Sequence, residues 1–187
     1  MESASLMERK RQWGIIAGIV AVLGAVLYII TTQVGNVPKP LSIGGAAPRF
    51  TANTLTGQPK SLDAYKGRVV LLNIWATWCG PCRAEMPSIE ALHKAYAPKG
   101  LSVVAVSVDD EGQERQIADF GKEFGLTFEL LHDAPGAIQQ AYQTAGVPES
   151  FVIARDGTIR KRWMGAEDWN SPANRALVEQ LLAEGAP

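Results

Sequence analysis

The chain has 187 residues, of which 47% are hydrophobic and 20% charged. This length and composition fit one ordinary globular domain with a short appendage. The formal net charge of −1 at pH 7 leaves no broad basic surface of the kind that binds a phosphate backbone, so nucleic-acid binding is excluded.

An uncharged stretch near the start, residues 13–32, predicts a membrane-spanning helix, because twenty helical residues span roughly 30 Å. Basic residues occupy positions 9–11 and no comparable cluster follows, so the positive-inside rule places residues 1–12 in the cytoplasm and the rest beyond the inner membrane, in the periplasm. A cleaved signal peptide is the alternative. The length of the stretch and the absence of a small-x-small site after Tyr28 favour the uncleaved anchor.

Residues 33–48 are rich in Gly and Pro, which is typical of a linker, so the globular domain is predicted at 49–187. A small hairpin from Phe50 to the turn at Gly67 opens it. Further elements then alternate along the chain. Strands are predicted at 69–74, 101–108 and 128–131, helices at 81–96 (with a kink at Pro87), 113–124, 134–142 and 172–183, and a hairpin at 150–154 and 159–163. This order indicates a three-layer α/β/α domain with a mixed central sheet.

The only two cysteines, Cys79 and Cys82, lie where a buried strand ends and a helix begins. A helix N-terminus presents unpaired amide hydrogens and partial positive charge, which favour thiolate over thiol. Cys79 is therefore the predicted nucleophile, and Cys82, one turn into the helix, the resolving cysteine. Pro81 suits the first helical turn, where its missing amide hydrogen would be unpaired anyway.

Two other interpretations of the pair are a zinc site and a static disulfide. Zinc needs four ligands, and besides the cysteines the chain offers only His93 and His132, so no metal is expected. A structural disulfide normally closes a long loop, which a bridge across two residues does not. A redox-active Cys79–Cys82 disulfide is therefore favoured, with no further cofactor.

The segment from Trp75 to Pro87, WATWCGPCRAEMP, resembles the active-site segment of thioredoxin-like proteins, specifically the exported TlpA/ResA/CcmG group. The likeness covers roughly residues 43–184 and includes Gly146–Phe151, which resembles the group's cis-proline loop, and Arg155–Gly157. It implies a thioredoxin-like fold in which a cis-Pro148 faces the cysteines, although an ordinary turn proline is the alternative. The resemblance assigns substrate binding to Trp78, Gly80, Pro81, Val147 and Pro148.

Asn73 departs from cytosolic thioredoxin, which carries a buried acid at the matching position. Glu85, three residues after Cys82, matches an acidic position of the ResA-like branch and is the candidate to exchange protons with Cys82. A capping or surface carboxylate in the first helical turn is the equally weighted alternative. Trp75 is expected in the core.

The acidic stretch 109–111 and the helix after it, together residues 109–125, occupy the place of an extra segment in this exported group. Partner selection and a simple solvated loop explain the stretch equally well. His93 and His132 are interpreted as bystanders.

A Gly-Pro dipeptide between the cysteines is the arrangement of thioredoxin, whose potential near −270 mV is more reducing than that of DsbA near −120 mV. The leading hypothesis is thus an extracytoplasmic reductase of disulfides in exported proteins, such as apocytochrome c. Because that compartment is oxidising, the resemblance implies a membrane thiol carrier as electron donor.

Three alternative functions stay open. A disulfide-forming oxidase or isomerase would have a higher potential. A thiol peroxidase-like redoxin typically carries a Pro-x-x-x-Thr/Ser-x-x-Cys pattern, and Leu72 and Ala76 stand at those positions. A non-enzymatic tethered binding module would not need Cys79.

Overall fold

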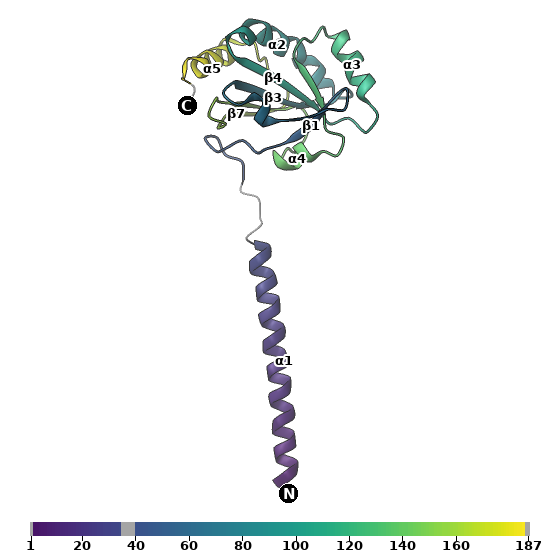
Figure 1. Cartoon of the computed structure of the whole chain (residues 1–187), viewed down its shortest axis with the longest axis vertical. Coiled ribbons are helices and arrows are strands. Elements are labelled where there is room, and N and C mark those ends of the chain that lie inside the picture. The colour runs from purple at the N-terminus through teal and green to yellow at the C-terminus, as the bar shows by residue number, and fades with distance from the viewer. Residues whose placement is uncertain (1, 35–39, 186–187) are drawn as a thin grey trace. The chain divides into compact units, whose positions relative to one another are not determined.

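The structure, a computed structural model, describes residues 2–34 and 40–185, in two compact units divided after Pro40. The first unit contains α1 (Glu2–Val34), labelled in Figure 1. Within it, Gln12–Thr31 is long and apolar enough to cross a membrane, and none of this stretch is buried.

The predicted span of residues 13–32 lies inside α1, which continues beyond it at both ends. The side chains of residues 9–11 and the part of the predicted linker at 35–39 lie outside the described residues. The predicted membrane anchor therefore corresponds to a helix of suitable length, and anchoring and orientation stay predictions.

The second unit is an α/β domain whose elements alternate along the chain. They are β1 (Thr51–Thr54), β2 (Pro59–Ser61), the 3-10 helix η1 (Leu62–Tyr65), β3 (Val69–Trp75), α2 (Gly80–Tyr96), the 3-10 helix η2 (Ala97–Lys99), β4 (Leu101–Ser107), α3 (Glu114–Glu123), β5 (Glu129–His132), α4 (Ala137–Ala141), β6 (Glu149–Ile153), β7 (Ile159–Met164) and α5 (Pro172–Ala183).

The seven strands form one mixed sheet in the order β2-β1-β5-β4-β3-β6-β7. β3 runs parallel to β4 and antiparallel to β6, and β4 is also parallel to β5. Every residue of β3 is buried, which explains why all of its residues except Asn73 are apolar. β3 lies between β4 and β6 and is the strand that leads into the cysteine pair.

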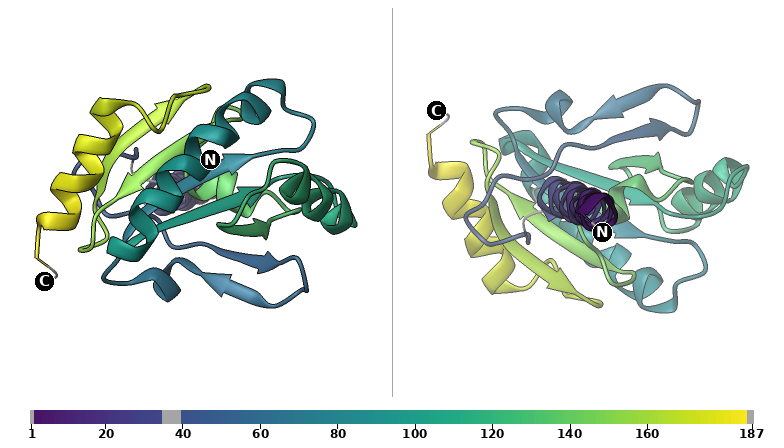
Figure 2. Two further views of the ribbon diagram at one scale, coloured as in Figure 1. Left: turned by 90° about the horizontal axis from the view of Figure 1, so that it is seen from above. Right: turned by 90° about the horizontal axis from the view of Figure 1, so that it is seen from below.

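Helices cover both faces of this sheet, as the thioredoxin-like resemblance predicts. α2, α3 and α5 pack on one face, where Leu71 and Met86 belong to a core that also contains both cysteines. α4 and the chain before β1 cover the other face. Figures 1 and 2 show α2 and α5 on the same side of the strands. The three-layer α/β/α prediction is confirmed.

The compact domain begins at Leu41, earlier than the predicted start at Arg49. Gly44 N donates to Ile159 O at 2.7 Å, and Ala47 N donates to Gly157 O at 2.8 Å. The stretch predicted as linker therefore partly extends the sheet edge beside β7. Gly44 has a positive φ of 84°, which glycine adopts without strain.

The helix predicted at 134–142 is shorter in the structure, where α4 begins at Ala137. Gly136 takes a left-handed conformation with φ 69°, and the Asp133 carboxylate accepts the Ile138 N–H at 2.6 Å. The residues before Ala137 thus form a capped turn instead of helix. α2, by contrast, continues as one helix across Pro87.

Candidate functional site

The two cysteines lie at the junction of β3 and α2 and form a disulfide with an S–S distance of 2.11 Å. Cys79 is the N-cap residue of α2, and the Cys82 N–H donates to Cys79 Sγ at 3.2 Å. Pro81 lies in the first turn, as predicted. The same amide would stabilise a negative charge on Cys79 Sγ once the disulfide is reduced.

The cysteines differ in their access to solvent. Cys79 is 5% exposed and Cys82 is 0% exposed. Gly80 and Pro81, which separate them, are both exposed, and Trp78 beside Cys79 is 69% exposed. Trp78 and Cys79 are therefore the more accessible side chains of the site, and the order in which the two cysteines react stays a prediction.

Glu85 lies inside the domain, only 2% exposed, one turn beyond Cys82. Its Oε1 accepts from Asn73 Nδ2 at 2.7 Å, and its Oε2 accepts from the Glu167 N–H at 3.3 Å. Burial raises the pKa of Glu85 to about 7, although both hydrogen bonds favour the charged form. A surface carboxylate is thus excluded, and proton exchange with Cys82 stays a prediction.

Asn73 joins Glu85 to the sheet. Its Nδ2 also donates to Ser150 Oγ at 2.9 Å, and Asn73 and Ser150 are register partners on β3 and β6. Asn73 is 0% exposed. The contribution of Ser150 and Glu167 to this network could not be predicted from sequence, because both residues reach Glu85 only through the fold.

The loop before β6 carries the predicted cis-proline. The Val147–Pro148 peptide bond is cis, as the resemblance implies, and Pro148 is buried. Val147 is half-buried and packs against the core cluster that contains both cysteines. Gly165 N donates to Pro148 O at 2.8 Å, which fixes the loop to the end of β7.

Asp109 and His132 are buried, although nothing in the sequence places either of them inside the domain. Asp109 is 2% exposed, so the solvated-loop interpretation is wrong for it, whereas Asp110 and Glu111 are exposed. His132 is 5% exposed, with Nε2 2.9 Å from the Asp109 carbonyl oxygen.

His93 packs edge-on against Phe128, and burial lowers its pKa. Trp75 is 0% exposed and belongs to the core, as expected. Among the residues that the structure describes, no group of three or more His, Cys, Asp or Glu side chains could hold a metal ion.

Residues 43–162 match the AhpC/TSA family. The chain belongs to this family. The thiol-disulfide oxidoreductase ResA of Geobacillus kaustophilus is 32% identical over 143 residues, which make up 76% of this chain and 81% of that protein. The thioredoxin-like protein YneN of Bacillus subtilis is 43% identical over 123 residues, covering 65% of this chain and 71% of that protein.

Solved structures agree with this assignment within the AhpC/TSA family. A crystal structure of a candidate thiol:disulfide interchange protein DsbE from Chlorobium tepidum is 32% identical, with a TM-score of 0.64, and covers 76% of this chain and 96% of that chain. This member of the family is therefore a thiol-disulfide oxidoreductase with a thioredoxin-like domain and an N-terminal apolar helix.

Proposed function

We propose that this oxidoreductase reduces disulfides in exported proteins, with its catalytic domain beyond the membrane and α1 as its anchor. The observation that carries the proposal is Cys79 at the N-cap of α2, with the Cys82 N–H directed at its sulfur and Cys82 itself buried. This arrangement suits an attacking thiol followed by a resolving one.

The reaction proceeds in two exchanges. The Cys79 thiolate attacks one sulfur of the client disulfide, forming a mixed disulfide and releasing the first client thiolate, which takes up a proton. Cys82 then loses its proton to the Glu85 carboxylate and attacks Cys79 Sγ. The second client thiolate leaves, and the two electrons of the enzyme dithiol have passed to the client.

Each turnover leaves the Cys79–Cys82 disulfide, so a further dithiol must return two electrons. A membrane thiol carrier supplied from the cytoplasm fits this requirement, because the exported compartment is oxidising. An apolar helix of membrane-spanning length would keep donor and acceptor in one plane. Apocytochrome c before haem attachment is the proposed client.

A trapping experiment tests the client. The Cys82→Ser variant of the full chain cannot resolve the mixed disulfide, so its Cys79 should remain bound to native clients in the exported compartment. Mass spectrometry of these adducts is expected to show exported proteins with a cysteine pair, apocytochrome c among them. Cys79→Ser is the matched control and should trap nothing. Equal recovery with both variants would overturn the proposal.

The equilibrium potential decides the direction of electron flow. Titration of the full chain against glutathione or dithiothreitol buffers is expected to give a reduction potential of about −270 mV, the value of thioredoxin. A value above about −180 mV would assign the protein to the disulfide-forming oxidases or isomerases instead.

A further inference from the structure

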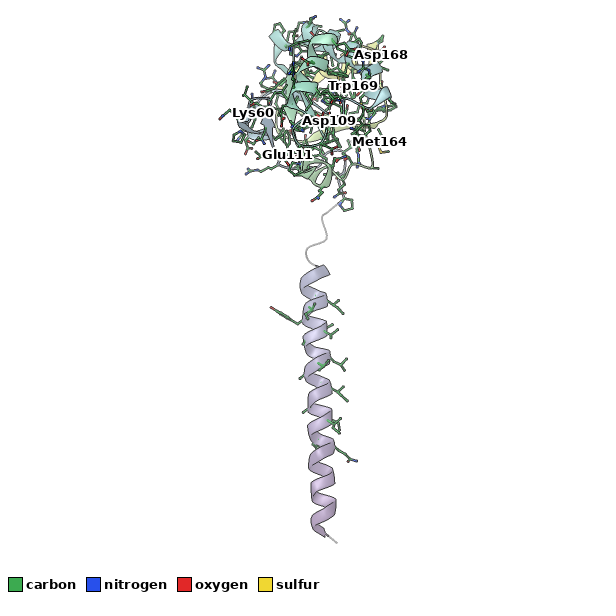
Figure 3. The ribbon with its side chains drawn as sticks, turned by 90° about the vertical axis from the view of Figure 1, so that its right-hand side faces the viewer. Lys60, Asp109, Glu111, Met164, Asp168 and Trp169 are labelled. Atoms are coloured by element: carbon green, nitrogen blue, oxygen red, sulfur yellow. A yellow bond between two sulfur atoms is a disulfide. The ribbon has the colours of Figure 1, made fainter. Side chains whose placement is uncertain are left out.

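Asp109 lies directly beyond the end of β4, next to the loop that carries Cys79, and is labelled in Figure 3. Trp75 at the end of β3 and Ser107 at the end of β4 are register partners on adjacent parallel strands. Thr77 and Asp109 each follow two residues later, so the sheet register brings them together. The Asp109 side chain is therefore placed beside the segment that enters the active site.

Both oxygens of the Asp109 carboxylate hold Thr77. Oδ2 accepts the Thr77 N–H at 3.0 Å, and Oδ1 accepts the Thr77 hydroxyl at 2.7 Å. Ser107 Oγ also donates to Oδ2, at 2.5 Å. Hydrogen bonds to a charged acceptor in a site this buried are strong, and removal of the acceptor would leave buried donors unsatisfied.

Two neighbouring elements also contact Thr77 and Asp109. Gln116 of α3 donates from Nε2 to Thr77 Oγ1 at 2.7 Å. His132 at the end of β5 lies 2.9 Å from the Asp109 carbonyl oxygen. Elements on two sides of the loop thus hold the Asp109–Thr77 contact, which makes it more rigid than an isolated loop hydrogen bond.

The short loop between Thr77 and Cys79 connects the Asp109–Thr77 contact to the nucleophile. Thr77 precedes Cys79 by two residues, and the Cys79 N–H donates to Ala76 O at 3.2 Å. The contact of Cys79 Sγ with the Cys82 N–H depends on where this short loop places Cys79. We infer that Asp109 is a positioning residue for the proposed reductase reaction, which holds Cys79 Sγ at the N-terminus of α2 through Thr77.

Two opposite effects separate positioning from simple electrostatics. The negative charge of Asp109 opposes a second negative charge nearby, so removal of that charge by itself would lower the pKa of the Cys79 thiol. Loss of the positioning contact would raise that pKa, because the sulfur would move away from the Cys82 N–H and the helix dipole.

The test uses the reduced full chain in detergent micelles. Iodoacetamide alkylation of Cys79 is followed as a function of pH, the modified cysteine is assigned by peptide mass spectrometry, and unfolding is measured in parallel. The variants are Asp109→Ala, Asp109→Asn and Thr77→Val. The last removes the hydroxyl contact but keeps the charge of Asp109.

Glu90→Ala provides a matched control on α2. Glu90 is 6% exposed, and its carboxylate holds the Thr127 N–H at 2.9 Å and the Thr127 hydroxyl at 2.7 Å. The two Thr127 contacts match those that Asp109 makes with Thr77, with an ion pair to Lys94 at 3.0 Å in addition, and they lie two turns along the helix from Cys82. The variant reports what loss of a buried carboxylate does to stability alone.

Asp109→Ala is expected to raise the Cys79 pKa by about one unit and to slow alkylation at neutral pH about tenfold, since the thiolate is the reacting form. Asp109→Asn and Thr77→Val each keep one of the two hydrogen bonds between positions 109 and 77. Both variants should slow alkylation about threefold, because a smaller rise in the Cys79 pKa leaves more thiolate. Glu90→Ala should stay within about twofold of wild type. The two milder variants carry the test if Asp109→Ala does not fold.

Three results would overturn the inference: an unchanged or lowered Cys79 pKa in the three variants, an equal effect of Glu90→Ala, or a wild-type Cys79 as slow as an ordinary thiol with pKa near 8.5. The last result would also remove the proposed function. If wild-type Cys79 is reactive and the variants alkylate at the same rate as wild type, only this inference is overturned and the proposed function stands.

Discussion

Glu85 has a buried carboxyl group whose charge is supported by two N–H donors and by no cation in the part of the chain that the structure describes. Burial wins over these hydrogen bonds and raises its pKa to about 7. A proton can therefore leave or bind Glu85 near neutral pH, where Cys82 must be deprotonated for the second exchange.

This raised pKa predicts a pH-dependent stability. The folded protein holds the Glu85 proton up to about pH 7, whereas the unfolded chain loses it near the ordinary value of 4.5. Between these values the folded state binds more protons, so the free energy of unfolding falls as pH rises. Over this window the fall attributable to Glu85 is about 3 kcal/mol at most.

Glu85→Gln should abolish this contribution. Urea unfolding of the oxidised full chain in micelles, measured from pH 4.5 to 8 for both proteins, gives the difference in free energy of unfolding. Wild type should lose stability relative to Glu85→Gln as pH rises through this range. A difference that does not change with pH would contradict the prediction. In a separate titration of the reduced proteins, unchanged pKa values of the Cys79 and Cys82 thiols in Glu85→Gln would remove Glu85 from the mechanism.

The two cysteines could be selected from their spacing at a strand-to-helix junction, and Glu85 from its place one turn after Cys82 together with the resemblance to an acidic position of the ResA-like branch. The sequence did not allow the roles of Asp109 and Ser150 to be predicted. Each bonds to a residue more than thirty positions away, so only the sheet register brings them to the site.

At the scale of elements, buried strands were the most predictable feature. β3 and β4 are covered on both faces, so their sequences are mostly apolar, with Asn73, Ser102 and Ser107 as the polar exceptions. The helix predicted at 134–142 is too long at its start, because Pro135 and the left-handed Gly136 disfavour helix and the Asp133 carboxylate closes a turn onto Ile138. The composition of residues 33–48 predicts a linker, yet part of this stretch lies along the sheet edge, because Gly and Pro are common in both settings.

Arg155 connects three elements and gives an element-scale prediction. It follows β6, and its guanidinium donates to Gly67 O before β3 at 3.1 Å and to Leu182 O near the end of α5 at 3.2 Å. A lysine has one nitrogen and cannot reproduce this fork. Arg155→Lys should therefore lower the free energy of unfolding by about 1–3 kcal/mol and speed amide exchange in the last turn of α5.

Arg160→Lys is the control for this change, since Arg160 also binds the end of α5, through Glu184, but at side-chain exposures of 37% and 39%. A surface pair of this kind contributes about 0–1 kcal/mol. Hydrogen exchange with mass spectrometry compares the two variants. Equal exchange of the α5 peptides in both would show that Arg155 does not fasten the helix.

The whole molecule consists of an apolar helix and a catalytic domain as separate compact units. The proposed reductase mechanism would use both, because a dithiol in an oxidising exported compartment would have to be recharged from the cytoplasmic side. The apolar stretch could be recognised from length and charge alone. Its side of insertion depends on the charges that flank it, which is a property of the chain with its membrane.

The positive-inside rule predicts that the catalytic domain lies outside the cytoplasm, and the length of the apolar stretch with no small-x-small site after Tyr28 predicts that the anchor is retained. With an epitope tag before Met1, the intact chain should fractionate with membranes, and protease added to spheroplasts should digest the catalytic domain but spare the tag.

Replacement of Arg9, Lys10 and Arg11 by Ala, with three Lys inserted after Val34, should protect the domain in a large fraction of the molecules. A charge-preserving variant, Arg9→Lys with Arg11→Lys, should behave as wild type. A soluble, tag-free domain would instead identify the helix as a cleaved signal peptide, and a wild-type domain protected from protease would place the active site in the cytoplasm.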